Sequence, residues 1–439
     1  MKKIVSTLIA LMMVLVCFAG CSSTPAADSD SSAPAADSTA ASEDAASGDA
    51  IKVGVLAPLT GSVAEYGVAV ANGIKMYVEE FNAAGGINGK QIQLIEYDEE
   101  GDSAKAVTGY NSLVDQGVTA IIGDVTTAPT VAVVVESQAD QMPMITASAT
   151  ADAVTVAEDG TVYENMFRSC FIDPFQGSKM ASFASEKLSA KTAAVLYNTG
   201  SDYSIGCAEA FQEQAAAMGM EVVAVESYAD GATEFQSQLT NIAAKTPDVL
   251  FIPDYYSVIA LVAQQANAAG VTATMLGSDG WDSVLDVVTD ASLLEGSYYC
   301  SGYSTQDTSE AVQTFVSAYQ EKYDASPNMF AAQGYDAAMI MCAALAKAEE
   351  QGLTAGTAEY MAAVIDALNA TDMECVTGHV TYDEFNNPEK TAAIINITGG
   401  AAEFWGKYLF HPSPFSRGNN NCCCGENSRF PRTASQMKP

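Results

Sequence analysis

Apolar and polar positions follow two patterns that alternate along most of the chain. Short apolar runs such as IKVGVLAPL (51–59) and TAAVLYN (192–198) predict buried strands. Longer stretches with an apolar residue every three or four positions, such as YGVAVANGIKMYVEEFNAAGG (66–86), predict amphipathic helices that end at glycine. Because predicted strands and helices alternate along the chain, the pattern favours parallel sheets with helices on both faces.

The alternation occurs twice and predicts two doubly wound halves of similar build. In the first half we expect strands at 51–59, 90–100, 118–123 and 143–149, with helices at 66–86, 103–117 and 128–141. In the second half we expect strands at 192–198, 221–228, 248–254 and 272–280, with helices at 204–219, 235–246 and 256–270. Two further helices are expected at 309–323 and 328–352. The fold class is therefore α/β.

Composition and charge exclude several functions. The chain has 439 residues, enough for two domains, and a formal net charge of -35, which would repel a nucleic acid. Its 2 histidines leave little material for a catalytic triad or a histidine metal site. An enzyme on a doubly wound fold is the competing class, but the dinucleotide, phosphate-loop, nucleophile-elbow and HExxH motifs are all missing. We therefore expect no catalysis, cofactor or metal.

The N-terminus has the features of a secreted protein. Lys2 and Lys3 precede the apolar run IVSTLIALMMVLVCFAG, which is short for a membrane span, so residues 1–20 predict a signal peptide. The following FAGC resembles a bacterial lipobox, in which Cys21 is lipidated and becomes the mature N-terminus. The alternative is a plain secretory signal with an incidental cysteine.

The segments at the two ends of the mature chain differ from the rest. Residues 21–50 contain no Lys, Arg or aromatic residue and predict a flexible acidic tether. Residues 409–439 hold four basic residues, one acidic residue and three consecutive cysteines, in a chain otherwise poor in Lys and Arg. We interpret this tail as the product of a frameshift or read-through. A metal-binding tail using Cys422, Cys423 and Cys424 is the alternative, but it lacks a spaced partner.

A series of motifs in a fixed order carries a family resemblance. In chain order they are GVLAPLTGSVAEYG, VEEFNAAGGINGKQIQLIEYDEEGDSAKAV, AIIGDVTTAP, MPMITASATAD, NMFRSCFIDPFQG, ANAAGVTATMLGSDGWDS and GYDAAMI. Together they resemble the extracytoplasmic substrate-binding protein of a branched-chain amino-acid ABC importer, a type I periplasmic binding protein. Each motif is weak by itself, and their order from residue 54 to residue 340 is what makes the resemblance specific.

The resemblance implies two doubly wound α/β lobes that are joined by three crossing segments and close on a ligand like a flytrap. We expect the crossings near 169–172, 300–303 and 377–380. Lobe 1 is then 51–170 with 302–378, and lobe 2 is 171–301 with 379–408. Cys170 and Cys300 fall in two of the crossings, so they could lie within disulfide reach. The alternative is that both are buried and reduced.

The loop before the helix of 128–141 is a candidate carboxylate site. In GDVTTAP an apolar strand gives way to small and polar residues before the helix begins, and no phosphate motif is present. A helix N-terminus offers unpaired N–H groups and a partial positive charge, which suit a carboxylate as well as a phosphate. By resemblance, Thr127 takes the place of the carboxylate-binding hydroxyl, and Val125 and Thr126 line the same loop. The compatible alternative is that Thr126 or Thr127 caps the helix.

The resemblance places further polar contacts at the ends of two other strands. Ser148 and Ala149 would contribute a backbone carbonyl and an N–H group, and Thr150 a hydroxyl, although an ordinary turn would have the same composition. Asp279 matches the acidic partner of a ligand ammonium, a group that needs a carboxylate in a dry cleft. Asp282 is the nearby competitor for this role.

Aromatic side chains are expected to complete the ligand cup. Tyr66 comes from the first lobe, Tyr203 and Tyr255 come from the second, and Trp281 would form a wall of the side-chain pocket. Phe330 is a weaker candidate for another wall. The alternative for each is packing in the core or at the surface. The ligand would bind lobe 1 first, and closure would then bring Asp279 and the tyrosines onto it.

The function implied by the resemblance is capture of a free amino acid, most often a branched-chain aliphatic one, for an ABC permease with its ATPase subunits. The protein would act as a monomer, lipid-anchored to the outer face of the bacterial cell membrane or periplasmic. The alternative is a flytrap-type sensor, or a binding protein for an amide, urea or another small carboxylate.

Overall fold

The computed structural model of the protein describes residues 50–408. The expected signal peptide, the lipidation site at Cys21, nearly all of the tether and the tail after residue 408 lie outside the described residues. Those expectations therefore stay predictions.

The first sheet is parallel throughout. Its strands are β1 (Ile51–Ala57), β2 (Ile92–Asp98), β3 (Ala120–Ile122), β4 (Met144–Thr146) and β5 (Met166–Arg168), in the order β2-β1-β3-β4-β5. The order reverses next to β1, so the loops at the carboxyl ends of β1 and β3 diverge to opposite faces. In a doubly wound sheet, ligands bind in the crevice that this divergence leaves.

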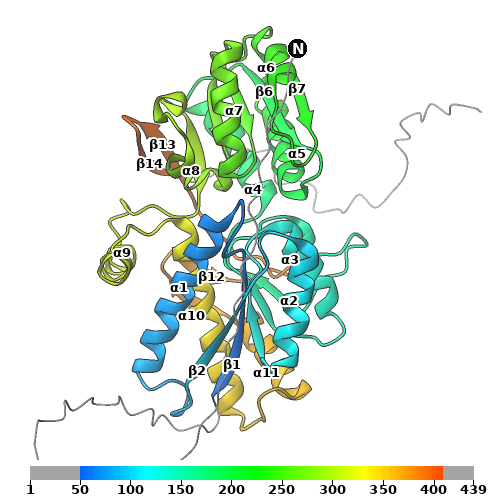
Figure 1. Ribbon diagram of the computed structural model, residues 1–439, viewed down its shortest axis with the longest axis vertical. Helices are drawn as coiled ribbons and strands as arrows, with labels where there is room; N and C mark the ends of the chain where they lie inside the picture. Colours follow the sequence, from blue (N-terminus) through cyan, green and yellow to red (C-terminus); the bar gives the residue numbers. More distant parts are fainter. Residues whose placement is uncertain (1–49, 409–439) are drawn as a thin grey trace, which may run out of the picture. The chain divides into compact units, whose positions relative to one another are not determined.

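Helices cover both faces of this sheet (Figure 1). They are α1 (Ala64–Ala83), α2 (Ser103–Asp115), α3 (Thr127–Ser137), α10 (Met329–Glu350) and α11 (Ala358–Asn369). Val53 and Val55 of β1 pack in one core cluster with residues of α1 and α10, whereas Leu56 packs in another with residues of α2 and α3. This alternation is what a strand buried on both faces requires.

Two glycines allow α1 and α10 to pack closely. A Cβ atom at Gly73 would lie 2.1 Å from the carbonyl oxygen of Ala331, and one at Gly334 would lie 2.4 Å from that of Val70. Helix α10 is also long and apolar enough to span a membrane, the one such helix in the described part of the chain. However, 78% of its most apolar window is buried, as expected for the core helix of a globular domain.

The second sheet repeats the strand order of the first and then extends it. Strands β6 (Thr192–Asn198), β7 (Glu221–Tyr228), β8 (Val249–Ile252), β9 (Thr274–Gly277) and β10 (Tyr298–Ser301) are parallel in the order β7-β6-β8-β9-β10. Two antiparallel strands, β13 (Ala392–Thr398) and β14 (Ala401–Tyr408), then continue the sheet beyond β10. The sequence thus predicted β6 to β9 correctly, but it placed the end of β10 in the second crossing segment. The antiparallel edge comes from the last described segment.

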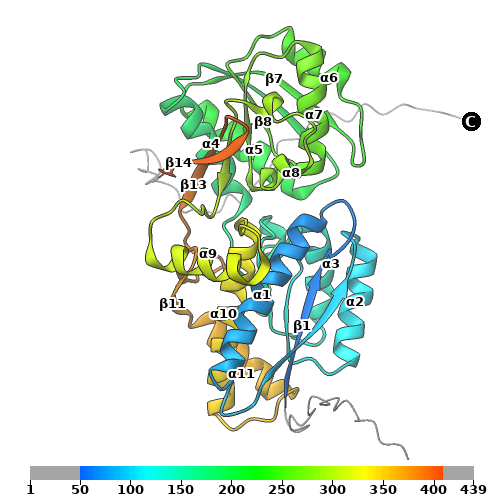
Figure 2. The ribbon, with the colours of Figure 1, turned by 60° about the vertical axis from the view of Figure 1, so that its left-hand side comes forward.

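Helices also cover both faces of the second sheet (Figure 2). They are α4 (Asp173–Glu186), α5 (Asp202–Ala217), α6 (Gln236–Ala243), α7 (Tyr256–Ala269) and the short α8 (Val284–Val287). Phe183 of α4 and Phe211 of α5 share a core cluster with Phe251, and the neighbouring Leu250 packs with residues of α6 and α7. The predicted fold class, two doubly wound α/β lobes, is confirmed.

The chain passes between the two sheets three times. The first connection is 169–172, between β5 and α4, and the second is 302–309, between β10 and α9 (Glu310–Tyr323). The third runs over 382–391 and enters β13, so it comes later than predicted.

The segment expected to form the third connection is a hairpin strand instead. Strand β12 (Gly378–Thr381) pairs antiparallel with β11 (Asp372–Cys375). The side chain of Asp336 accepts hydrogen bonds from the N–H groups of Val376 and Thr377 at 2.7 and 3.0 Å, which holds the hairpin on α10. The lobe boundaries given above otherwise stay a prediction.

The cysteines of the described residues are buried thiols. Cys170, Cys207, Cys300, Cys342 and Cys375 are all free. Cys170 and Cys300 are not bonded to each other, which excludes the disulfide alternative in this structure.

Candidate functional site

The loop between β3 and α3 brings the predicted carboxylate-binding residues to the edge of the first sheet. Thr126 is the N-cap residue of α3, but its side chain makes no capping hydrogen bond. The side chain of Thr127 is buried at the first helical position. Tyr255, from the second lobe, lines the same cavity as Thr127. Burial raises the pKa of the Tyr255 hydroxyl, and the Thr127 backbone lowers it in part. In the described form, the N-terminus of α3 therefore faces a phenol of the second lobe.

The end of β4 supports this loop through one hydroxyl. Thr146 Oγ1 donates to the carbonyl of Asp124 at 2.5 Å and accepts from the N–H group of Ala149 at 3.0 Å. Ser148 Oγ donates to the carbonyl of Val125 at 2.7 Å. Thr146 and Ser148 thus join the two loops to each other, and the ligand contacts of Ser148 and Ala149 stay a prediction. Sequence reasoning missed Thr146, whose signal is a polar residue inside an otherwise apolar strand.

A buried arginine fixes the next part of the same loop. Arg168, at the end of β5, donates from Nη1 to the carbonyl of Ala149 at 3.1 Å and from Nη2 to that of Ala151 at 2.9 Å. A third bond, from Nη2 to Thr155 Oγ1, measures 3.0 Å. Burial lowers the pKa of this guanidinium. Because Thr150 lies between the two carbonyls, Arg168 determines where its hydroxyl is held.

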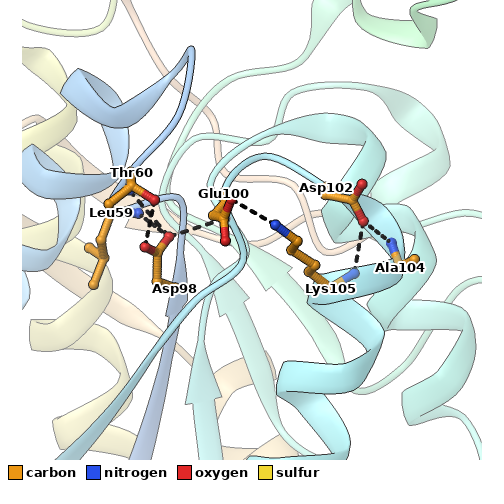
Figure 3. A network of polar contacts seen from close by, with 7 residues as sticks. All are labelled: Leu59, Thr60, Asp98, Glu100, Asp102, Ala104 and Lys105. Atoms are coloured by element: carbon orange, nitrogen blue, oxygen red, sulfur yellow. Dashed lines mark hydrogen bonds and ion pairs between the residues drawn. The ribbon is translucent and has the colours of Figure 1, made fainter. Parts of the chain in front are cut away.

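The loop that precedes Tyr66 is fixed by Asp98, the last residue of β2 (Figure 3). The Asp98 carboxylate accepts from the N–H groups of Leu59 and Thr60 at 2.9 and 3.2 Å and from Thr60 Oγ1 at 2.7 Å. These three bonds tie the β1–α1 loop to β2. They place the first turn of α1, which carries Tyr66, at the carboxyl edge of the sheet.

In the second lobe, Asp279 is held by a tyrosine. Tyr203 Oη donates to Asp279 Oδ1 at 2.7 Å, lies 2.6 Å from Ser278 Oγ and accepts from the N–H group of Gly280 at 2.9 Å. Asp279 is 2% exposed, and burial raises its pKa to about 6. The carboxyl group of the competitor Asp282 accepts from the N–H group of Met329 at 2.9 Å instead, and its charge adds to the raised pKa of Asp279.

The three predicted tyrosines form one cluster with Phe330. The ring of Tyr66 stacks on Phe330 with a centroid distance of 4.1 Å and meets Tyr255 edge-on at 5.8 Å. Tyr255 stacks in turn on Tyr203 at 5.1 Å. Burial raises the pKa of all three tyrosines, so their hydroxyls remain protonated donors.

A cavity of about 430 Å³ lies beside this cluster. Thr126 and Thr127 line it from the first lobe, and Asp254 and Tyr255 line it from the second. Tyr66, Ser148, Thr150, Tyr203 and Asp279 are buried and do not line it.

Trp281 is buried in the second lobe. Its indole N–H donates to the carbonyl of Ile252 at 2.8 Å, and its ring packs against Gly277 in the core of the second lobe. It lines a different cavity, of about 320 Å³, together with Asp282 and Tyr299. Trp281 therefore does not line the cavity beside the tyrosine cluster, and its role as a wall of the ligand cup stays a prediction. Over residues 50–408, no group of three or more His, Cys, Asp or Glu side chains is arranged to hold a metal.

Comparison with known proteins decides what kind of site this is. A sequence model of the periplasmic binding protein family matches residues 50–401. The chain belongs to this family. Its members bind substrates for transport, and it is not an enzyme family, so the protein is an extracytoplasmic substrate-binding protein.

Individual relatives agree with this assignment. The leucine-, isoleucine-, valine-, threonine- and alanine-binding protein of Pseudomonas aeruginosa is 27% identical over 338 residues, which cover 76% of this chain and 86% of that protein. The Leu/Ile/Val-binding protein of Escherichia coli K12 is 26% identical over 334 residues, covering 76% and 87%.

A solved structure gives the same picture at higher identity. The branched-chain amino-acid transporter substrate-binding protein LivJ of Streptococcus pneumoniae, in complex with isoleucine, is 33% identical with a TM-score of 0.73. The match covers 82% of this chain and 100% of that one.

Proposed function

We propose that the protein captures a free amino acid with a branched aliphatic side chain between its two lobes and delivers it to an ABC permease. It would do so as a monomer, anchored by a lipid on Cys21 to the outer face of the cell membrane. The relatives described above are binding proteins for leucine, isoleucine and valine, and the isoleucine complex has the same fold over the whole of that chain.

The observation that carries this proposal is the chemistry at the two sides of the tyrosine cluster. On one side lies the N-terminus of α3 with Thr127, which suits a carboxylate. On the other side lies the buried carboxylate of Asp279, which suits an ammonium. The tyrosine rings between them offer apolar surface for an aliphatic side chain.

In this proposal, the ligand first meets the residues of the first lobe. Thr127 takes its carboxylate, and the carbonyl and N–H groups of Ser148 and Ala149, with the Thr150 hydroxyl, divide between its carboxylate and its ammonium. Val125 and Thr126 line the same loop as Thr127. Closure then places Asp279 against the ammonium and Tyr66, Tyr203 and Tyr255 around the side chain. The ligand favours the closed form because it makes these additional contacts only there.

A thermal-shift experiment tests the proposal. The purified protein, unfolded and refolded to remove bound ligand, is heated with leucine, isoleucine, valine, 4-methylpentanoate or 3-methylbutylamine. A ligand at a hundred times its dissociation constant adds about 2.7 kcal/mol of stability. We expect stabilisation only by the amino acids, because the other two compounds each lack one of the charged groups.

Two variants make the assignment specific. We expect Asp279→Asn to abolish the stabilisation by leucine. Asp282→Asn should retain it, because Asp282 is bonded to Met329 at the start of α10 instead. Stabilisation by 4-methylpentanoate alone, or by none of these compounds, would overturn the amino-acid assignment.

A further inference from the structure

A second buried carboxyl, whose pKa is raised by burial and by the charge of Asp279, lies directly after the first connection between the lobes. Asp173, the first residue of α4, is 1% exposed. Its Oδ1 accepts from Gln176 Nε2 at 3.2 Å and from the thiol of Cys207 at 3.4 Å. Its Oδ2 is buried and makes no hydrogen bond. A buried carboxylate oxygen without a partner is costly, so this group needs a proton or a cation.

Asp173 is linked to predicted ligand-binding residues in both lobes. Its N–H group donates to the carbonyl of Thr150 at 3.0 Å, and the Thr150 hydroxyl lies near its carboxyl group. Gln176 Oε1 accepts from the N–H group of Asp279 at 2.9 Å. Through Gln176, the two carboxyl-bearing residues therefore belong to one network that joins the end of β4 to the end of β9.

The charged groups around this network favour ionisation of only one of the two carboxyl groups, those of Asp173 and Asp279. The titratable and charged groups that act on Asp173 are Asp279, Cys207, Tyr255, Cys170 and Arg168. Arg168, the cation among them, is already bonded to two carbonyls and a hydroxyl. Burial raises the pKa of Asp173 to about 8, against about 6 for Asp279. Near pH 7, the two carboxyl groups therefore hold one proton between them, chiefly on Asp173.

We propose that Asp173 is a specificity-determining residue at the amine end of the site: its proton leaves when the ligand ammonium enters, and the two carboxylates together then hold that cation. The inference rests on the proposed function, because it takes the ligand to be an amino acid. It adds that amine selection needs both acids, with Gln176 keeping Asp279 in place.

Proton release separates this role from a merely structural one. Leucine binding is measured by titration calorimetry at pH 7 in phosphate and in Tris, two buffers with different heats of ionisation. For the wild type, we expect the binding heat to differ between the buffers by an amount that corresponds to release of up to one proton. We expect Asp173→Asn to weaken leucine binding about tenfold and to remove most of the buffer dependence.

Asp336→Asn is the matched control, because it replaces another buried acid, one that acts on neither Asp173 nor Asp279. It should leave both the affinity and the buffer dependence unchanged. If Asp173→Asn does not fold, the proton release that accompanies leucine binding is measured for the wild type at pH 7 and pH 9. It should be much smaller at pH 9, because Asp173 is already ionised there before the ligand binds.

The outcomes are distinguishable. Leucine binding by the wild type without proton release at pH 7, or unchanged affinity and release in Asp173→Asn, would overturn the role of Asp173 and leave the proposed function standing. Failure of the wild type to bind any amino acid would overturn the proposed function, and this inference with it.

Discussion

The hydroxyl of Tyr66 donates a 2.5 Å hydrogen bond to the carbonyl of Gly280, a residue 214 positions later in the chain. The same hydroxyl accepts from the N–H group of Tyr256 at 3.1 Å. Tyr66 lies in the first turn of α1, on the first sheet, whereas Gly280 and Tyr256 follow strands of the second. One buried phenol thus joins the two lobes by bonds to two backbone groups.

Removing this hydroxyl should weaken the closed form. Tyr66→Phe keeps the ring that stacks on Phe330 but leaves the Gly280 carbonyl and the Tyr256 N–H group without this partner. Because a hydrogen bond contributes about 1 kcal/mol net, we expect ligand affinity to fall about three- to tenfold, mainly through faster dissociation. Stopped-flow fluorescence and calorimetry measure both quantities.

Tyr323→Phe is the control for this prediction. Its hydroxyl donates to the carbonyl of Asn72 at 2.9 Å within the first lobe, so its loss should lower stability without changing affinity. Equal affinities of Tyr66→Phe and wild type would contradict the proposed role of Tyr66 in closure.

Two buried acids, Glu99 directly after β2 and Asp124 in the loop before α3, should make the free energy of unfolding depend on pH. Glu99 and Asp124 are both 0% exposed, and neither Glu99 oxygen has a hydrogen-bond partner. Burial raises the pKa of Glu99 from 4.5 to about 7, and burial together with the charge of Glu99 raises that of Asp124. The folded state thus holds protons more tightly than the unfolded chain. The resulting stability is fully present below about pH 4.5 and is lost as pH rises through about 7.

Glu99→Gln tests this dependence. The amide cannot ionise, so we expect the fall in the free energy of unfolding between pH 5.5 and pH 8 to shrink by about 1–2 kcal/mol. Urea denaturation at the two pH values measures it. Glu100→Gln, which alters an exposed glutamate paired with Lys105, should keep the wild-type slope. An unchanged slope in Glu99→Gln would show that Glu99 is not the group that titrates.

The guanidinium of Arg168 should be needed for both stability and binding. Arg168→Lys replaces a planar group that reaches two carbonyls and a hydroxyl with a single ammonium. We expect a loss of about 2–3 kcal/mol in the free energy of unfolding, because buried carbonyls lose their donors. We also expect weaker ligand binding, since the Thr150 loop is released. Thermal unfolding and calorimetry check the two effects, and wild-type values for both would contradict this assignment.

The close packing of α1 against α10 should not tolerate a methyl group. In Gly73→Ala, the added Cβ would lie 2.1 Å from the Ala331 carbonyl oxygen, so the helices must move apart. We expect a destabilisation of about 1–3 kcal/mol, measured by chemical denaturation. Val68→Ala, at a position of α1 that is 42% exposed, is the control and should change stability by less than about 0.5 kcal/mol. Similar stabilities of the two variants would mean that the helices separate at little cost.

The sequence by itself determined the elements and the general place of the site. The apolar run of 51–59 became β1, and the loop after the short run AIIG became the N-terminus of α3, because these signals depend on neighbouring residues alone. The positions of Tyr66, Tyr203 and Tyr255, each where a strand gives way to the next helix, were also local information. It was enough to place them at the carboxyl edges of two sheets, where they meet.

Only the tertiary structure decided which polar groups pair. Arg168 and Asp173 flank one connection in the sequence, yet their partners lie in the loops after β4 and on α5, and Gln176 reaches the end of β9. Trp281 follows Asp279 closely, but its indole turns into the core. Pairing of this kind depends on how distant segments pack, and a buried polar group must find its partner among whatever packing brings near. Apolar periodicity carries no information about that choice.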